Sequence, residues 1–318
     1  MNTESNETID LSVVIPCYNE ECGISELLRR VKLACQNTNL HYEILLIDDG
    51  SSDSTWEKLN QYYQDDSTLS ILRLSRNHGH QLALTAGLSK ARSKKYIFVM
   101  DADLQDPPEL LSPMLQLMQN EGADVVYGQR KHRAGESHFK LITASLFYRT
   151  LRFLTSVNIP ADTGDFRLMT RRVLDVFLDM PEHARFIRGM ISWIGFKQIP
   201  ILYDRDPRFA GTTKYPLSKM LKLAFDAITS FSIKPLQISI IAGGLFAFLG
   251  ICGFIYSLIS YFFFHTVKGW TSLVSMFSIM SSVQFIILGV IGEYIGRIYL
   301  ESQRRPLFMI ADYKSSHD

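Results

Sequence analysis

Residues 96–108 read YIFVMDADLQDPP, an apolar run that ends on two closely spaced aspartates and then on two prolines. The run Tyr96–Met100 predicts a buried strand, because strands covered on both faces read as continuous apolar stretches. Asp101 and Asp103 then leave the strand near one point, and the prolines stiffen the loop that follows. A small number of oxygen ligands suits Mg²⁺ or Mn²⁺, which are usually held by one or two carboxylates plus substrate phosphates. An acidic loop cap is the alternative for an isolated Asp-x-Asp pattern.

The alternation of apolar strands and helical segments continues on both sides of this stretch. Further strands are predicted at Leu11–Pro16, Tyr42–Ile47, Leu69–Leu74 and Asp124–Tyr127, and helices at Glu26–Cys35, Ser54–Tyr63, Gln81–Ala91 and Leu110–Asn120. Strands that alternate with helices predict an α/β fold whose mainly parallel sheet is covered on both faces. In such sheets ligands bind beyond the carboxyl ends of the strands. The pattern therefore predicts a binding site at the edge where Asp101 and Asp103 follow their strand.

A second acidic pair, Asp48-Asp49, follows the strand predicted at Tyr42–Ile47. The next residue, Gly50, permits a tight turn, and the two carboxylates are suited to accept hydrogen bonds from a ribose or a base. The alternative is a helix N-cap formed by one of the next three residues, Ser51, Ser52 or Asp53. Both roles are compatible, because the capping groups and the binding carboxylates are different side chains.

Composition and charge narrow the class of protein. The chain has 318 residues with a net charge of +1, which argues against a general nucleic-acid binder. Its four cysteines form no Cys-x-x-Cys pair, so reduced thiols are expected, with a metal site at Cys17 and Cys22 as the weaker alternative. Residues 1–10 are polar and lack an apolar signal core, so we expect a disordered leader and a cytoplasmic domain.

Two long uncharged stretches, Leu236–Phe264 and Gly269–Gly292, lie in the last third of the chain. Each exceeds the roughly 20 residues that span a bilayer, which predicts two transmembrane helices within 235–297, at about 236–264 and 270–294. Flanking lysines and arginines place both ends in the cytoplasm, with 298–318 as a cytoplasmic tail. Near the end of the second span, Glu293 is expected to pair with Arg297 one turn on. A pair of buried core helices is the alternative, and it is disfavoured by the length of the runs.

Two segments with mixed apolar and basic residues, Phe139–Phe153 and Pro216–Ser230, have helical spacing. Such helices lie in a bilayer interface or, as ordinary helices, cover a sheet. The sequence leaves the first segment open between these roles. The second runs almost directly into the first span, so residues 215–234 are predicted to form an interface helix.

Seven motifs occur in order along the chain: VVIPCYNE, LLIDDGSSDST, LSRNHGHQLALTAGL, MDADLQDPPE, TGDFRLM, RFAGTTKY and GVIGEYIGRIY. Together they resemble the polyisoprenyl-phosphate glycosyltransferases of glycosyltransferase family 2, in particular bactoprenol glucosyltransferases and dolichol-phosphate mannose synthase. The resemblance covers nearly the whole chain. It implies a Rossmann-like A-type glycosyltransferase domain over residues 11–214, and an oligomer of identical chains such as a homotetramer.

The resemblance also implies roles for individual residues. The nucleoside is expected to be held by Pro16, Tyr18, Glu20, Asp48 and Asp49. The metal and the diphosphate are expected on Asp101, Asp103 and Gln105, and the sugar nucleotide near Arg76. His80 stands where the family often carries a basic residue after Asn-x-Gly, which leaves the contact at that position open.

Predicted acceptor-side residues follow from the same resemblance. Asp165, with Arg167 as its positioner, is a candidate base or a group that orients sugar hydroxyls, and a structural Asp–Arg pair is the alternative. Arg208 and Lys214 are expected to bind phosphate or diphosphate. Weaker candidates for the lipid phosphate are Arg130 and Lys140, with a solvated basic surface as the alternative. The residues predicted to act in catalysis are Asp103, Asp165 and Arg208.

The implied reaction is inverting transfer of a hexose, preferentially glucose from UDP-glucose, onto undecaprenyl phosphate at the cytoplasmic face of the inner membrane. The lipid-linked product is expected to serve cell-envelope glycan modification, as in lipopolysaccharide or O-antigen. Alternatives are transfer from GDP-mannose, UDP-N-acetylglucosamine or a UDP-amino-arabinose derivative, and a non-catalytic membrane scaffold. A processive polysaccharide synthase is disfavoured, because two spans are too few for a channel and no QxxRW motif is present. A polyprenyl phosphate is already anionic, so a catalytic base is optional; the cation and positive side chains must stabilise the departing diphosphate.

Overall fold

The computed structural model describes residues 8–130, 163–204, 234–264 and 269–315. The chain divides into two compact units, and each is described by itself. The sheet unit comprises Met1–Tyr148, Val157–Met220 and Arg305–Asp318, and the helical-pair unit comprises Arg149–Ser156 and Leu221–Arg304. The helices predicted at 139–153 and 216–230 lie outside the described residues, as do Lys140, Arg208 and Lys214.

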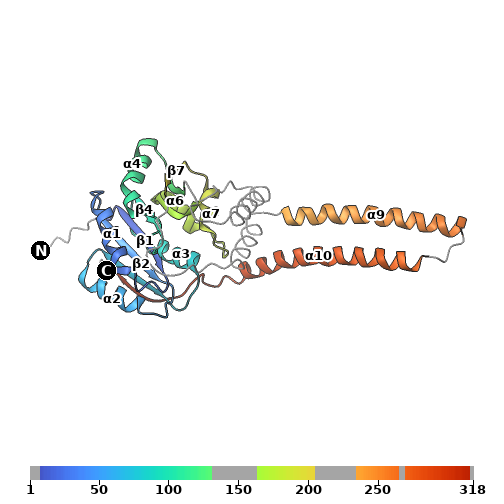
Figure 1. The fold of residues 1–318 in the computed structure, drawn as a ribbon, viewed down its shortest axis with the longest axis horizontal. Coiled ribbons are helices and arrows are strands. Elements are labelled where there is room, and N and C mark those ends of the chain that lie inside the picture. Colours follow the sequence, from blue (N-terminus) through green and yellow to red (C-terminus); the bar gives the residue numbers. More distant parts are fainter. Residues whose placement is uncertain (1–7, 131–162, 205–233, 265–268, 316–318) are drawn as a thin grey trace. The chain divides into compact units, whose positions relative to one another are not determined.

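The sheet unit is built on one eight-stranded sheet (Figure 1). Its strands are β1 (Leu11–Cys17), β2 (Tyr42–Asp48), β3 (Leu69–Leu74), β4 (Tyr96–Val99), β5 (Val125–Arg130), β6 (Thr163–Thr170), β7 (Gln198–Tyr203) and β8 (Ile310–Ser315). They lie in the order β7-β5-β6-β4-β1-β2-β3-β8. Parallel pairs join β1 to β2 and β4, β2 to β3, and β5 to β7. Only β6 and β8 run antiparallel to their neighbours, which confirms the predicted α/β fold with a mostly parallel sheet.

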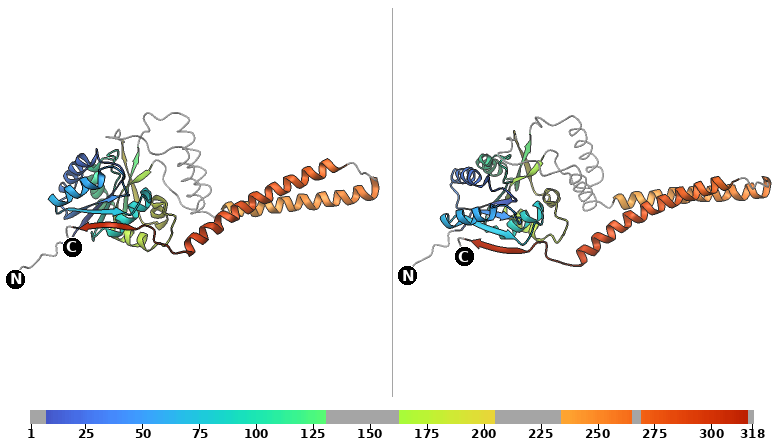
Figure 2. Two further views of the ribbon diagram at one scale, coloured as in Figure 1. Left: turned by 90° about the horizontal axis from the view of Figure 1, so that it is seen from below. Right: turned by 60° about the horizontal axis from the view of Figure 1, so that its bottom comes forward.

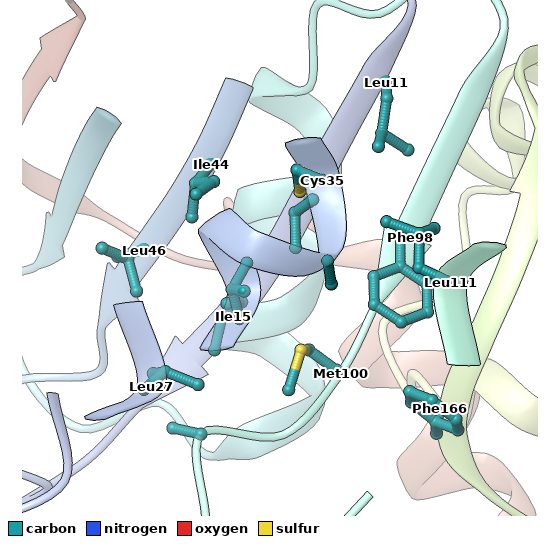
Figure 3. Packing of buried hydrophobic residues seen from close by; sticks show 14 of the residues in the cluster. Leu11, Ile15, Leu27, Cys35, Ile44, Leu46, Phe98, Met100, Leu111 and Phe166 are labelled. Atoms are coloured by element: carbon teal, nitrogen blue, oxygen red, sulfur yellow. The ribbon is translucent and has the colours of Figure 1, made fainter. Parts of the chain in front are cut away.

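Helices cover both faces of the sheet because side chains alternate between the faces along each strand. One layer consists of α1 (Ile24–Gln36), α2 (Thr55–Asp65) and α4 (Leu111–Glu121), the last preceded by a short 3-10 turn at Pro108–Leu110. Figure 3 shows this side of the core, with Ile15 and Leu46 of the strands beside Leu27 of α1. Two aromatic rings also pack against each other in this core: the ring centroids of Phe98 and Phe166 lie 5.3 Å apart, in an edge-to-face arrangement.

The opposite layer consists of α3 (His80–Lys90), α6 (Arg171–Asp179) and α7 (Ile187–Ile194). Gly87 brings α3 close to the sheet, because a Cβ at this position would lie 2.4 Å from Ile47 Cδ1 and 2.6 Å from Val14 Cγ1. The close approach fixes the position of the α3 N-terminus, where two residues of the candidate site are found.

Strand β6 differs from the prediction for its sequence. No strand is predicted at residues 163–167, which carry the two opposite charges of Asp165 and Arg167. Instead the segment is a central strand, with Val99 of β4 opposite Arg167 on one side and Gln129 of β5 opposite Thr163 on the other. Asp165 and Arg167 are both buried, and their charges lie 3.8 Å apart in the interior. A buried strand normally lacks charges, so this strand, which is covered on both faces, could not be recognised from its sequence.

The C-terminal segment also differs from the predicted tail. It includes β8, which pairs antiparallel with β3 and places Tyr313 opposite Leu72 (Figure 2, red strand). Side chains reinforce the pairing: Lys314 Nζ donates to Asn60 Oδ1 at 2.6 Å, and Lys90 Nζ lies 5.2 Å from the centre of the Tyr313 ring. The sequence IADYKS is too short and polar to predict a strand without its partner.

The helical-pair unit consists of α9 (Lys234–Phe264) and α10 (Trp270–Ser302), which lie antiparallel and side by side (Figures 1 and 2). Within the described part of the chain, one helical segment, Ile279–Ser302, is long and apolar enough to cross a membrane. The predicted span at about 236–264 coincides with α9, and its crossing of a membrane stays a prediction. The expected pairing of Glu293 with Arg297 is confirmed, with Arg297 Nε 3.0 Å from Glu293 Oε1.

Candidate active site

The strand directions bring the predicted site residues to one edge of the sheet. The parallel strands β1 to β4 all end at this edge. Strand β6 begins there because it runs antiparallel to β4, and β5 and β7 end there because Gln129 pairs with Thr163 and Arg130 with Tyr203. The edge therefore collects both acidic pairs, Asp165 and Arg130, although they are far apart in the sequence.

The loops after β1 and β2 are hydrogen-bonded to each other. Asn19 N donates to Ser51 Oγ at 3.0 Å, and Glu20 N donates to Thr55 Oγ1 at 2.9 Å. Asn19 has a φ of 53°, a left-handed conformation that asparagine tolerates better than most residues. Pro16 is buried at the end of β1, whereas the Tyr18 ring is exposed on the joined loops. Of the residues predicted to hold the nucleoside, Tyr18 and Glu20 are therefore accessible on these loops, whereas Pro16, Asp48 and Asp49 are buried.

The carboxylates of Asp48 and Asp49 brace the neighbouring loops. Asp49 accepts hydrogen bonds from the backbone N–H groups of His78 at 2.7 Å and Gly79 at 2.9 Å. Asp48 accepts one from Ser51 N at 3.0 Å and lies 3.2 Å from Arg73 Nε. Burial raises the pKa of Asp49 above its ordinary value, although the two N–H donors oppose the shift. These carboxylates thus already accept hydrogen bonds from protein groups. Their expected contact with a nucleoside stays a prediction.

The two remaining predictions for this side concern the helix cap and Arg76. The N-cap position of α2 is Ser54, without a side-chain cap hydrogen bond, and not Ser51, Ser52 or Asp53 as the capping alternative had it. Asp53 Oδ1 does accept a hydrogen bond from Thr55 N, the first residue of α2, at 3.0 Å. Arg76 is exposed in the loop after β3, where its Nη1 donates to Asn77 O at 3.3 Å. Its expected proximity to a sugar nucleotide is untested.

Asp101 and Asp103 lie on a constrained turn after β4. Asp103 Oδ1 accepts a hydrogen bond from Gln105 N at 3.2 Å. Between them and Gln105, the buried Leu104 has a φ of 56°, which is unusual for a residue with a Cβ. Asp101 Oδ1 is buried and accepts no hydrogen bond from any residue that the structure describes, while a third of the side chain is exposed. The carboxylate of Asp101 on this turn therefore has hydrogen-bonding capacity that the described protein groups do not use.

These residues fit a divalent cation that is shared with a substrate. Across the described ranges, no group of three or more His, Cys, Asp or Glu side chains could enclose a metal ion by itself. Mg²⁺ characteristically takes one or two carboxylates and completes its shell with substrate phosphates and water. Burial and the nearby carboxylates of Asp106, Asp165 and Asp103 raise the pKa of Asp101 to about 6, although His80 opposes the shift. A cation would relieve this repulsion, so the donor set and its charge both fit the ion.

Asp165 lies at the centre of a buried polar cluster. Its Oδ2 contacts His80 Nε2 at 3.2 Å, Gln81 Nε2 at 2.8 Å and Arg188 Nη2 at 3.3 Å. Arg167 packs against its other oxygen and also donates to the carbonyl of Gly164 at 3.0 Å. Burial alone would raise the pKa of Asp165, but Arg188, His80 and Arg167 outweigh it and hold the pKa well below its usual range. We name these five residues the Asp165 cluster.

His80 joins this cluster to the acidic turn. The same ring nitrogen that contacts Asp165 lies 3.4 Å from Asp101 Oδ1. Burial alone would lower the pKa of His80, but the two carboxylates raise it to about 9. The His80 imidazole therefore lies between the end of β4, which Asp101 follows, and β6, which carries Asp165.

A second cluster surrounds Arg130, a residue predicted to bind lipid phosphate. Tyr203 Oη donates to Asp106 Oδ1, and Arg130 lies 3.5 Å from Tyr203 Oη and 3.9 Å from Asp106 Oδ1. A Cβ at Gly164 would lie 3.4 Å from Arg130 Nη2, at van der Waals contact, so β6 begins directly beside the guanidinium. Arg130 is partly exposed beside this cluster, and its contact with a phosphate stays a prediction.

Sequence reasoning did not assign Gln81, Arg188 or Tyr203 to the site. Gln81 follows His80 directly within the motif LSRNHGHQLALTAGL, and this position in a motif was the only signal it carried. Arg188 and Tyr203 reach the site through α7 and β7, neither of which was predicted. Asp106 follows Asp103 closely in the sequence, but it is buried against Tyr203.

Comparisons with known proteins identify the family of this chain. The family model "Glycosyl transferase family 2" matches residues 12–178, just over half of the chain. A Bacillus subtilis protein called uncharacterized glycosyltransferase YkcC is 47% identical, covering 95% of this chain and 93% of its own. The prophage bactoprenol glucosyl transferase homolog of Escherichia coli K12 is 36% identical, covering 96% and 99%. The bactoprenol glucosyl transferase of Shigella phage SfV is 35% identical over the same shares.

Among solved structures, mannosyl-3-phosphoglycerate synthase from Rubrobacter xylanophilus is 15% identical, covers 69% of this chain and 72% of its own, and superposes with a TM-score of 0.49. The family match and the relatives together confirm the resemblance found in the sequence motifs. The chain belongs to glycosyl transferase family 2, among relatives that include the bactoprenol glucosyl transferases.

Proposed function

We propose that this protein transfers glucose from UDP-glucose onto undecaprenyl phosphate at the cytoplasmic face of the inner membrane, with Mg²⁺ or Mn²⁺ bound. The observation that carries the proposal is a match over 96% of the chain to proteins named bactoprenol glucosyl transferase. That match extends past the sheet unit into α9 and α10, so it includes the part of the chain suited to a lipid acceptor. The lipid-linked glucose is proposed to serve glycan modification of the cell envelope.

The donor is proposed to lie across the carboxyl ends of β1 to β4. The nucleoside is proposed to lie against the hydrogen-bonded loops after β1 and β2, which carry Pro16, Tyr18, Glu20, Asp48 and Asp49. Asp101, Asp103 and Gln105 hold the cation, which when bound neutralises charge on the diphosphate. Arg76 approaches the donor from the loop after β3. This arrangement is supported by the meeting of these loops at one edge of the sheet.

The chemistry proposed is a single displacement. An oxygen of the lipid phosphate forms a bond to the anomeric carbon while the bond from that carbon to the UDP oxygen breaks, so the anomeric configuration inverts. The attacking oxygen is already anionic and requires no deprotonation. Arg208 and Lys214 are proposed to stabilise the charge that moves onto UDP. For the lipid phosphate we propose Arg130, Lys140 and Arg208, of which only Arg130 lies in the described ranges.

Membrane attachment through α9 and α10 is part of the proposal. Large apolar side chains are exposed on α9, including Ile240 at 74% and Phe263 at 77%, and a soluble surface rarely carries so many. The chain leaves the sheet after β7 and returns to it at β8, so it must cross a bilayer an even number of times in between. A single crossing by Ile279–Ser302 is incompatible with this return, which favours two spans, α9 and α10.

The test is a donor comparison in membranes that contain the expressed chain. Undecaprenyl phosphate is supplied with radiolabelled UDP-glucose, GDP-mannose, UDP-N-acetylglucosamine or a UDP-amino-arabinose derivative, and lipids are extracted. We expect label in the lipid extract from UDP-glucose, with EDTA abolishing it. Label from another donor alone would replace glucose in the proposal, and no lipid-bound label from any donor would overturn it.

A non-catalytic scaffold predicts a different result in a binding experiment. Isothermal titration of UDP into the purified full chain is done with Mn²⁺ and again with EDTA. We expect heat of binding that depends on Mn²⁺. A scaffold would give no metal-dependent heat.

A further inference from the structure

Asp165 is enclosed by protein on every side that the structure describes. Its side chain is 3% exposed, and it contacts side chains from α3, β6 and α7. A general base must lie within about 2.6–3.2 Å of the atom that carries the proton, or reach it through one water. Asp165 Oδ2 is already contacted by three side chains, and Asp165 Oδ1 is buried beside Arg167. The surroundings resemble those of a structural anchor more closely than those of a group that meets substrate.

The first connection from this anchor leads to Asp101. His80 Nε2 lies between Asp165 Oδ2 at 3.2 Å and Asp101 Oδ1 at 3.4 Å. This is a contact between charged groups and not a hydrogen bond, and it lies at the buried oxygen of Asp101, while a third of that side chain is exposed. A carboxylate that binds a metal is commonly oriented by such an outer contact, and loss of the contact weakens metal binding.

The second connection leads to α7. Gln81 donates to Asp165 Oδ2 with its Nε2 and accepts a hydrogen bond from Ile187 N with its Oε1, both at 2.8 Å. Ile187 is the first residue of α7, so the glutamine satisfies a backbone donor that the helix leaves unpaired. Arg188 adds a hydrogen bond from Nη1 to the carbonyl of Thr163 at 3.1 Å. The start of α7 is thus tied to the start of β6 through the same carboxylate.

We infer that Asp165 acts as a buried anchor, not as a proton acceptor, and that His80 is a positioning residue through which Asp165 orients Asp101 toward the metal–nucleotide complex. The inference rests on the proposed function, because it takes Asp101 as a ligand of the donor's cation. Gln81 and Arg188 hold the anchor in place by joining it to α7. The chemistry of the proposed acceptor agrees with this role of Asp165, since an anionic phosphate oxygen carries no proton for a base to remove.

The experiment measures Mn²⁺ affinity in the presence of UDP, using the purified full chain in lipid nanodiscs and electron paramagnetic resonance. His80→Ala is expected to weaken Mn²⁺ binding by about 10–100-fold, and His80→Gln to recover most of the loss by supplying an N–H donor. Asp165→Asn is expected to weaken Mn²⁺ binding in the same direction. His41→Ala is the matched control, because this histidine is exposed just before β2, at the opposite ends of the strands.

The two roles of Asp165 predict opposite results. A proton acceptor would lose turnover in Asp165→Asn and keep wild-type Mn²⁺ affinity, which would overturn the inference. If melting temperatures show that Asp165→Asn does not fold, the His80 variants decide, and wild-type Mn²⁺ affinity in His80→Ala overturns it. A wild-type chain that transfers no sugar to lipid, yet binds Mn²⁺ and UDP in a His80-dependent way, would refute the proposed function and support the inference.

Discussion

Two glycines have similar left-handed backbone angles, but only one of them lies close to other backbone atoms. Substituting each by alanine therefore distinguishes the cost of backbone strain from the cost of steric crowding. Gly50 has a φ of 66° and Gly122 a φ of 59°, and both are left-handed. A Cβ at Gly50 would lie 2.5 Å from the backbone carbon of Arg76, whereas a Cβ at Gly122 would meet nothing within 4 Å. Gly50 therefore lets the loop after β2 touch the loop after β3, where the donor is proposed to bind.

Gly50→Ala is expected to lower stability by at least about 1 kcal/mol more than Gly122→Ala. Both variants carry the cost of a left-handed alanine, but only Gly50→Ala also forces a backbone shift. Thermal melting compares their stabilities, and titration with UDP compares the sites. We expect weaker UDP binding in Gly50→Ala and unchanged binding in Gly122→Ala. Equal effects of the two substitutions would show that the contact with Arg76 is unimportant.

Asp103→Ala is expected to abolish metal-dependent transfer, with a loss of at least about 100-fold in kcat, because a diphosphate leaving group requires its cation. The side chain is partly exposed on a turn, so the fold should remain largely intact. Asp179→Asn, at the exposed end of α6, is the control. Near-normal turnover of Asp103→Ala, at the same melting temperature as the wild type, would show that Asp103 does not hold the cation.

At the scale of residues, the sequence predicted the groups that follow a strand and missed those that arrive from elsewhere. Asp101 and Asp103 follow a continuous apolar run, so their place at the sheet edge could be inferred from the pattern. Gln81 and Arg188 meet Asp165 only in the folded chain, from 84 and 23 positions away in the sequence. A pattern along the chain has no access to such contacts.

Strand β8 covers an edge of the sheet that would otherwise present unpaired backbone groups. It pairs with β3, and its Lys314 lies 5.9 Å from the centre of the Trp56 ring. Exposed edges of this kind promote aggregation. The element that follows α10 therefore contributes to the stability of the sheet unit.

A chain truncated after residue 308 is expected to melt at a temperature lower by more than about 4 °C and to aggregate more readily, because it loses β8. Truncation after Ser315, which leaves β8 complete, is the control. Fluorescence of Trp56, which is nearly buried beneath Lys314, follows the melting. A truncated chain as stable as the control would mean that β8 is dispensable.

At the scale of elements, β6 and β8 were missed for different reasons. Strand β6 carries Asp165 and Arg167, whose charges are typical of a surface and are paired in the interior only because β4 and β5 flank them. Strand β8 is short and polar, and it becomes a strand by pairing with β3. The strands β1 to β4 were predicted correctly, because a strand that is buried on both faces has a continuous run of apolar residues in its own sequence.

Across the whole molecule, the return of the chain to its own sheet makes the membrane topology testable. The segment between β7 and β8 contains α9 and α10, and the two crossings that we propose would bring the C-terminus back to the side of the sheet unit. Reporter fusions at both termini are expected to be cytoplasmic. A cysteine placed at residues 265–268 should react with a membrane-impermeant reagent from the other side. A C-terminal reporter on that other side would refute two spans.

The class of fold was predictable at this scale, because alternating strands and helices determine a parallel sheet and its ligand edge. The order of the sheet was not, since β6 enters between β4 and β5 and β8 closes the far edge. The prediction of a polyprenyl phosphate acceptor came from the resemblance of the motifs to a known family. The periodicity of apolar residues holds no information about the acceptor.

The most direct test of the central claim is product analysis with the purified full chain. Undecaprenyl phosphate and UDP-glucose are incubated with the protein and Mg²⁺ or Mn²⁺, and the lipid product is examined by mass spectrometry and nuclear magnetic resonance. The account predicts undecaprenyl phosphate carrying one hexose, with inverted anomeric configuration. Free glucose and UDP beside unchanged lipid, or a product with retained configuration, would contradict it.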